Sequence, residues 1–167
     1  MIILIIQKVK KRHVWHYSCL EISMRKPRIL LFDDDNMLLE VLHYYFSARN
    51  FEVQSFSEPV LCPLAQNSSF CLNPCADIII TDFQMPGMNG VELLHYQTQR
   101  RCPINVKNKA IMSGALPDDF LDKMKEVADT FFQKPVHMQE LNEWARNCIS
   151  HHDLSQPLGS YGKAMDV

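Results

Sequence analysis

The sequence predicts one α/β domain, in which a five-stranded parallel sheet carries helices on both faces. Two observations support this prediction. Short apolar runs typical of buried strands alternate along the chain with segments whose apolar residues recur at helical spacing. The length of 167 residues and a hydrophobic fraction of 47% suit a single domain with modest extensions. Strands that alternate with helices favour parallel pairing through right-handed crossovers.

The domain begins with a strand and a helix. Residues 29–32 form a continuous apolar run that ends in acidic residues, as expected of a strand buried on both faces. Apolar residues then recur at helical spacing through residues 38–46, which predicts the first helix. Asp35 or Asn36 is a suitable N-cap for this helix, and Asn50 is a suitable stop.

The middle of the chain supplies two further strands. Residues 51–56 alternate between apolar and polar side chains, and residues 78–81 form a second buried apolar run. Between them, residues 58–76 contain three prolines and three cysteines, so we expect a short helix there and then a loop. Residues 89–94 predict the next helix, whose asparagine and glutamate three positions apart resemble a capping box.

The last part of the domain supplies two strands and two helices. Residues 110–112 and 130–133 are short apolar runs that predict strands. Between them, residues 117–127 predict a helix with proline at its first position, and residues 141–149 form the apolar stripe of a final helix. The polar segment from residue 151, which contains proline and glycine, predicts a disordered tail.

The first 25 residues stand apart from this pattern. The apolar opening at residues 2–6 is far too short to span a bilayer, which takes about 20 apolar residues. It also precedes its basic cluster, whereas a secretory signal places the charges first. We therefore expect a cytoplasmic protein with its folded domain at residues 26–150, preceded either by a flexible basic arm or by a leader from a start site assigned upstream of Met24.

The charge distribution restricts the kind of partner. Lys and Arg number 17 and Asp and Glu 19, but six of the basic residues lie within the first 26 positions, against Glu21 alone. The rest of the chain is therefore acidic, which disfavours direct nucleic-acid binding because that function needs a clustered basic face. An acidic body suits a protein that binds a divalent cation.

Six cysteines allow several interpretations, namely disulfides, a metal site or reduced thiols. They are Cys19, Cys62, Cys71, Cys75, Cys102 and Cys148. The closest pair has a three-residue gap that matches no common zinc spacing, and no paired histidines follow it. Without a secretion signal, reduced thiols are the favoured interpretation.

Polar residues with related chemistry stand at the ends of four predicted strands. Asp33 and Asp34 follow the first strand, Asp82 ends the third, Ser113 the fourth and Lys134 the fifth. The carboxyl ends of parallel strands meet at one edge of the sheet, so these side chains should share one crevice. Grouped carboxylates repel one another, and a hard cation such as Mg²⁺ relieves that repulsion. A carboxylate beside Mg²⁺ and an ammonium group can act as a nucleophile toward a phosphoryl group.

Four segments resemble the receiver domains of bacterial two-component systems, in the same order and at compatible spacings. They are Arg28-Ile-Leu-Leu-Phe-Asp-Asp-Asp, Asp77-Ile-Ile-Ile-Thr-Asp-Phe-Gln-Met-Pro-Gly-Met-Asn-Gly90, Ile111-Met-Ser-Gly and Phe132-Gln-Lys-Pro. The resemblance covers roughly residues 26–150. It implies a flavodoxin-like, doubly wound sheet with strand order 2-1-3-4-5.

The resemblance also implies a role for each matching residue. Asp82 matches the phosphoacceptor aspartate of the family. Mg²⁺ would be held by Asp33, Asp34, Asp82 and the backbone carbonyl of Gln84. Ser113, where threonine is commoner, and Lys134 match the residues that contact the phosphoryl group. Phe131 matches the switch aromatic and Pro135 the cis-proline, although Phe131 equally suits a core position and Asp35 suits a helix cap better than a metal ligand.

The implied function is a phosphorylated signalling switch in a two-component phosphorelay. A sensor histidine kinase or phosphotransfer protein would donate the phosphoryl group, and a downstream protein would dock on the face of the fourth helix, fifth strand and fifth helix. No output segment follows Ile149, which predicts action through a partner rather than turnover of a substrate. Two alternatives stay open: an aspartyl-nucleophile phosphatase, although Gln84 stands where such enzymes usually have a second acid, and a binding module that works without phosphorylation.

Overall fold

The computed structural model describes residues 2–11, 14–59, 74–115, 121–150 and 152–159. Five strands form the central sheet. They are β3 (Arg28–Phe32), β4 (Glu52–Phe56), β5 (Ile78–Asp82), β6 (Lys109–Ser113) and β7 (Thr130–Gln133). Their order across the sheet is β4-β3-β5-β6-β7, and every neighbouring pair is parallel. This arrangement confirms the predicted strand order 2-1-3-4-5 and the predicted α/β class.

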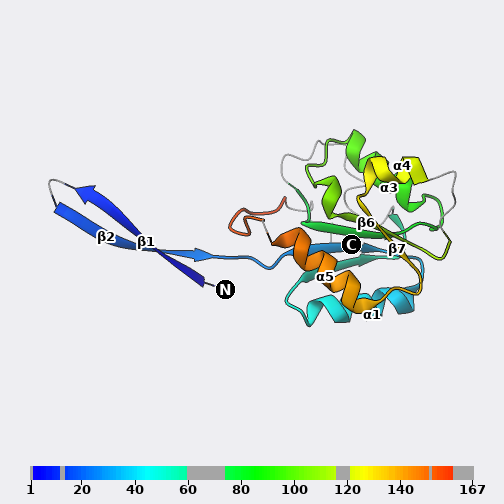
Figure 1. Ribbon diagram of the computed structural model, residues 1–167, viewed down its shortest axis with the longest axis horizontal. Helices are drawn as coiled ribbons and strands as arrows, with labels where there is room; N and C mark the ends of the chain where they lie inside the picture. The colour runs from blue at the N-terminus through cyan, green and yellow to red at the C-terminus, as the bar shows by residue number, and fades with distance from the viewer. Residues whose placement is uncertain (1, 12–13, 60–73, 116–120, 151, 160–167) are drawn as a thin grey trace, which may run out of the picture.

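The described helices lie on both faces of the sheet (Figure 1). They are α1 (Asn36–Ser47), α3 (Gly90–Gln99), the 3₁₀ helix η2 (Val106–Asn108), α4 (Leu121–Val127) and α5 (Met138–Ile149). The predicted helix at residues 89–94 is thus confirmed but continues to Gln99. Asp35 is the N-cap of α1, accepting hydrogen bonds from two backbone N–H groups, and Asn89 and Glu92 form the predicted capping box of α3.

Alternate side chains of the strands point to opposite faces of the sheet and pack into two separate hydrophobic cores. On one face, Leu30, Ile79 and Ile111 pack with Leu94 of α3 and Met124 of α4. On the other face, the intervening strand residues pack with the inner sides of α1 and α5. That second core includes Ile29, Leu31, Ile78, Ile80, Leu42, Phe46, Leu141 and Ala145. Burial of each such side chain contributes ~1.5–3 kcal/mol, so the two cores fix the strand ends that carry the site.

An antiparallel hairpin precedes the sheet domain. β1 (Ile2–Lys11) pairs with β2 (Val14–Ser23) along their whole length, and Figure 1 shows the hairpin extending away from the five-stranded sheet. The sequence analysis predicted no strand here. Isoleucine, valine and aromatic residues favour extended backbone, but the pattern lacks a glycine-rich turn signal between its two halves.

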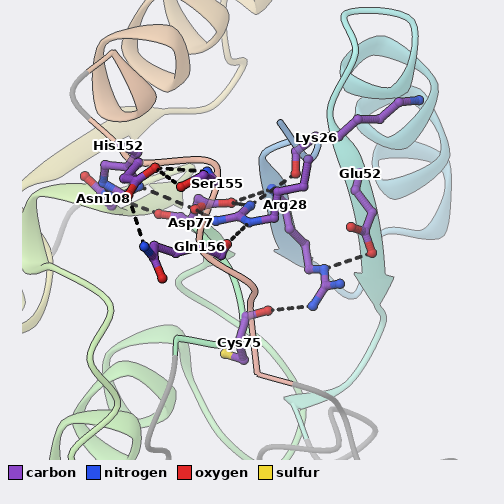
Figure 2. Close-up of polar contacts among 11 residues, drawn as sticks. Lys26, Arg28, Glu52, Cys75, Asp77, Asn108, His152, Ser155 and Gln156 are labelled. Carbon is purple, nitrogen blue, oxygen red and sulfur yellow. Dashed lines mark hydrogen bonds and ion pairs between the residues drawn. The ribbon is translucent and has the colours of Figure 1, made fainter. Parts of the chain in front are cut away.

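A C-terminal segment, residues 152–159, packs beside the amino-terminal end of the sheet (Figure 2). Gly159 donates a backbone hydrogen bond to Pro74, and Arg25 donates one to Leu154. Part of the segment predicted to be a disordered tail is therefore held to the domain by backbone contacts. The predicted helix start at residue 117 and most of the irregular segment 58–76 lie outside the described residues.

None of the helices in the described part of the chain combines the length and the apolar character that crossing a membrane requires.

Candidate functional site

Three carboxylates converge at the carboxyl-terminal edge of the sheet. Asp33 follows β3, Asp34 comes next, and Asp82 is the last residue of β5. One oxygen from each lies within 4.8 Å of the others. Asp33 and Asp82 are buried, at 0% and 5% exposure, whereas Asp34 is exposed. Parallel pairing of β3 with β5 brings these acids together, as the strand-end argument predicted.

The backbone around Asp33 fixes which acid faces the site. The Asp33 amide donates to the carbonyl of Phe56, which extends the ladder between β3 and β4 by one residue. The Asp33 carboxylate accepts from the Asp35 amide at 3.0 Å, and Asp35 in turn caps α1. Asp35 thus serves as a helix cap. Asp34, between Asp33 and Asp35 in the sequence, is exposed at the surface.

Lys134 joins the two buried acids. It follows β7, and its Nζ lies 2.7 Å from Asp33 Oδ2 and 2.8 Å from Asp82 Oδ1. Its backbone amide donates to the carbonyl of Ser113, which continues the pairing of β6 with β7. Burial disfavours the ammonium, but the hydrogen bonds to the two carboxylates outweigh burial and raise the pKa of Lys134. The side chain of Lys134 therefore remains protonated and positively charged at the site.

Asp33 is not fully compensated by this lysine. Burial raises the pKa of Asp33, and the charge of Asp82 acts in the same direction. The hydrogen bonds from Lys134 and from the Asp35 amide lower that pKa, but they do not offset burial. Three carboxylates facing one ammonium leave an excess of negative charge when all of them are ionised. The donor set therefore suits an additional hard cation, and oxygen ligands of this kind favour Mg²⁺.

The loop after Asp82 is shaped by hydrogen bonds and by one glycine. Asp82 Oδ2 accepts from the Gln84 amide at 3.0 Å, and Gly90 donates to the carbonyl of Phe83. A Cβ atom at Gly90 would lie only 2.2 Å from the Asp82 carbonyl oxygen, so only glycine allows this approach. The sequence analysis did not assign Gly90 to the site. Its only signal was its place at the end of the phrase that begins at Asp77.

The other predicted site residues, Ser113, Phe131 and Pro135, lie on β6 and β7 or close to their ends. Ser113 ends β6, is 2% exposed, and its hydroxyl donates to the carbonyl of Ala115. Phe131 in β7 is half-buried against the core shared by α3 and α4. The Lys134–Pro135 peptide bond is cis, as the resemblance implies. All the predicted site residues thus lie at one end of the sheet or on the strands that form it.

Comparisons with known proteins agree with this geometry. The family model described as the response regulator receiver domain matches residues 29–146. A transcriptional regulatory protein, AruR of Pseudomonas aeruginosa, is 26% identical over 133 residues, covering 74% of this chain and 49% of AruR. The putative two-component response regulator ARR21 of Arabidopsis thaliana is 25% identical over 138 residues, covering 77% of this chain and 20% of that protein. The chain therefore spans half the length of these relatives or less.

Solved structures show the same fold. A CheY-like receiver domain protein from Methanospirillum hungatei superposes with a TM-score of 0.63 at 21% identity, covering 77% of this chain and 95% of that one. A receiver domain protein from Clostridium thermocellum gives a TM-score of 0.58 at 25% identity, covering 74% and 94%. The sheet order, the strand-end acids and the match over residues 29–146 agree. The chain belongs to the response regulator receiver domain family.

Proposed function

We propose that this protein is a phosphorylated switch, in which Asp82 accepts a phosphoryl group with the help of Mg²⁺. The observation that carries the proposal is Lys134, whose Nζ bridges Asp33 and Asp82 at 2.7 and 2.8 Å. The bridge places a cation against the nucleophile and against a second acid at the same time. A phosphoryl group entering there would meet positive charge next to the attacking oxygen, which is the arrangement that phosphoryl transfer requires.

The residues divide the chemistry between them. The carboxylates of Asp33, Asp34 and Asp82, with the backbone carbonyl of Gln84, would hold Mg²⁺. Bound there, the ion would neutralise charge on the phosphoryl oxygens and orient them. An Asp82 oxygen forms the new O–P bond while the donor's bond to phosphorus breaks, and the donor atom takes up a proton. Lys134 supplies a persistent positive charge to the transferred group.

The switch would use Ser113 and Phe131. The Ser113 hydroxyl, now bonded to the Ala115 carbonyl, could instead donate to a phosphoryl oxygen on Asp82. Such a change would release the Ala115 carbonyl and allow the half-buried Phe131 ring to turn inward. The face of α4, β7 and α5 would then present a different surface to a downstream protein. The donor would be a histidine kinase or a phosphotransfer protein.

Mass spectrometry with a small donor tests the phosphoacceptor directly. Acetyl phosphate and Mg²⁺ should add the mass of one phosphoryl group, and the modification should map to Asp82. Asp82→Asn should abolish it, because the amide is not a nucleophile toward phosphorus. Asp35→Asn is the matched control: asparagine caps helices well, so the fold and the modification should both persist.

Two results would overturn the assignment of Asp82 as the phosphoacceptor of a switch. One is an unmodified wild-type protein after incubation with acetyl phosphate and Mg²⁺ under conditions where its fold is intact. The other is steady hydrolysis of a phosphomonoester that Asp82→Asn abolishes, which would assign the site to an aspartyl-nucleophile phosphatase. Equal partner affinity with and without beryllofluoride would leave the chemistry standing but refute the switch.

A further inference from the structure

Two thiols and a buried lysine meet at the amino-terminal end of the sheet, opposite the carboxylates. Cys75 lies just before β5, Cys102 follows α3, and Lys109 is the first residue of β6. The two thiols are in hydrogen-bonding contact, and Lys109 acts electrostatically on both. We refer to Cys75, Cys102 and Lys109 as the dithiol cluster. Nothing in the phosphoryl chemistry uses it.

Lys109 is unusual for a lysine because its side chain is only 2% exposed. Among the residues that the structure describes, it forms no ion pair with a carboxylate. Burial accordingly lowers the pKa of Lys109, and the ionisable groups that oppose this shift are the two thiols. A buried ammonium needs a compensating negative charge, and in this cluster a thiolate is the group that can supply one.

Cys102 is the better placed of the two thiols to become that thiolate. It is partly exposed, whereas Cys75 is buried. The hydrogen bond with Cys75 has the largest effect on the pKa of Cys102. Together with the hydrogen bond from the Ile104 backbone and the charge of Lys109, it outweighs burial and lowers that pKa to about 6. Cys148 offers the contrast: burial and the charge of Asp129 raise its pKa to about 12.

Reagents can reach the cluster at Cys102, whose side chain is only partly buried. A cavity of about 630 Å³ lies beside the residues that follow the two cysteines. Ala76, which follows Cys75, and Pro103 and Ile104, which follow Cys102, line this cavity. The cluster therefore combines a partly exposed thiol, a neighbouring second thiol and a buried lysine. These features are typical of cysteines that react with oxidants, because an accessible thiolate near a basic group is a good nucleophile toward a peroxide.

We propose that Cys75 and Cys102 are a redox-active dithiol, which a hydroperoxide converts into a disulfide. Cys102 is the nucleophile, and the neighbouring Lys109 favours its thiolate form. The Cys102 thiolate attacks a peroxide oxygen; an S–O bond forms, the O–O bond breaks, and the departing oxygen takes a proton from water. The Cys75 thiol then attacks the Cys102 sulfur. The S–S bond forms, the S–O bond breaks, and hydroxide leaves with the Cys75 proton as water. The dithiol loses two electrons, which reduce the peroxide.

Peptide mapping of the full chain tests the pairing. After exposure to hydrogen peroxide, alkylation and digestion without reductant, the Cys75 and Cys102 peptides should appear linked, lighter by two hydrogens than their sum. Cys75→Ser and Cys102→Ser should each abolish the linked peptide. Cys148→Ser is the matched control and should leave its yield unchanged, because that thiol is held protonated. A disulfide between Cys75 and any other cysteine, or no disulfide at all, would overturn the pairing.

The pH profile of Cys102 alkylation tests the role of Lys109. Wild-type protein should give a midpoint near 6, and Lys109→Met should move it toward the ordinary thiol value of about 8.5. Lys109→Arg, which keeps the charge, should retain the low midpoint. Circular dichroism separates this result from unfolding. A midpoint near 8.5 in the wild-type protein would refute the proposal without recourse to any variant.

Discussion

Each end of the sheet buries an aspartate against a basic side chain, yet the two ends are compensated very differently. At the carboxyl-terminal end, Asp33 shares the single ammonium of Lys134 with Asp82. At the amino-terminal end, Asp77 faces the Arg25 guanidinium alone, with Nη1 and Nη2 at 2.6 and 2.8 Å from its two oxygens. Asp33 therefore shares its cation with a second acid, whereas Asp77 has a bidentate ion pair with its arginine.

Further donors increase the difference (Figure 2). The Arg28 amide donates to Asp77 Oδ2 at 2.7 Å, and His152 Nδ1 lies 3.4 Å from Oδ1. Burial favours protonation of Asp77, but its partners, led by Arg25, outweigh burial and lower its pKa. At Asp33 the balance is reversed and the pKa is raised. Asp77 and its partners are thus electrostatically balanced, whereas the three acids at the carboxyl-terminal end lack sufficient positive charge.

The hydrogen-bonded network around Asp77 also attaches both flanking segments to the domain. Arg25 Nε donates to the Gln156 carbonyl at 2.7 Å, so one arginine connects the entry to β3 with the C-terminal segment. Asn108 Nδ2 donates to the Asp77 carbonyl and lies 2.8 Å from His152 Nε2. The Asp77 network therefore has a structural role, whereas the acids at the carboxyl-terminal end form a group suited to a cationic ligand.

The largest effect is expected from Asp77→Asn. The amide cannot balance the Arg25 guanidinium, and breaking one partner of a buried ion pair typically costs ~3–5 kcal/mol. The free energy of unfolding in urea should fall by about that amount. Asp82→Asn, a buried acid at the other end, is the matched control and should cost far less. Equal losses in the two variants would remove the distinction between the ends.

The pH dependence of stability should follow the Asp77 pair. Its pKa is lowered in the folded state, so its contribution is present above the unfolded value of about 3.9 and is lost as pH falls through the folded pKa. The difference in unfolding free energy between the wild-type protein and Asp77→Asn should therefore be constant near neutral pH and shrink below about pH 4. A difference that grows on acidification would contradict the assigned direction.

Mg²⁺ should stabilise the folded protein only by binding to the acids at the carboxyl-terminal end of the sheet. A ligand at ten times its Kd raises the free energy of unfolding by about 1.4 kcal/mol, and Mg²⁺ should produce such a rise in the wild-type protein. Asp34→Asn should reduce the rise, because Asp34 is the exposed member of the three acids whose oxygens lie within 4.8 Å of one another. Chelation should reverse it. Asp122→Asn, an exposed acid on α4, should leave the magnesium effect unchanged.

The sequence alone predicted the sheet and the carboxyl-terminal end correctly for one physical reason. Buried apolar strands are visible as short runs, and parallel pairing places whatever follows each run at the same edge. Asp33, Asp82 and Lys134 could therefore be grouped before any coordinates were considered. The helix caps at Asp35 and Asn89 were equally local, because each cap is set by residues two or three positions away.

The amino-terminal end was missed because its partners are not local. Arg25 and Asp77 are 52 positions apart, and Asp77 and His152 are 75 apart. No spacing rule links residues that only the finished sheet and the returning C-terminal segment bring together. Lys109 shows the same limit: a lysine before an apolar run suggests a surface position, and its burial depends on the packing of β6 between β5 and β7.

The smallest predicted effect has the opposite sign to the first. Asp33→Asn removes one charge from an end that has too few cations, and its amide oxygen can still accept from the Asp35 amide. Without divalent cations, the free energy of unfolding should rise by roughly 1 kcal/mol, since relief from desolvation and from the charge of Asp82 exceeds the loss of the Lys134 pair. Urea unfolding in the presence of a chelator measures this change. With saturating Mg²⁺ the gain should vanish, because the variant loses a ligand that the wild-type protein retains. If Asp33→Asn destabilised the chelated protein as strongly as Asp77→Asn, Asp33 would be a structural acid, and the two ends of the sheet would not differ in kind.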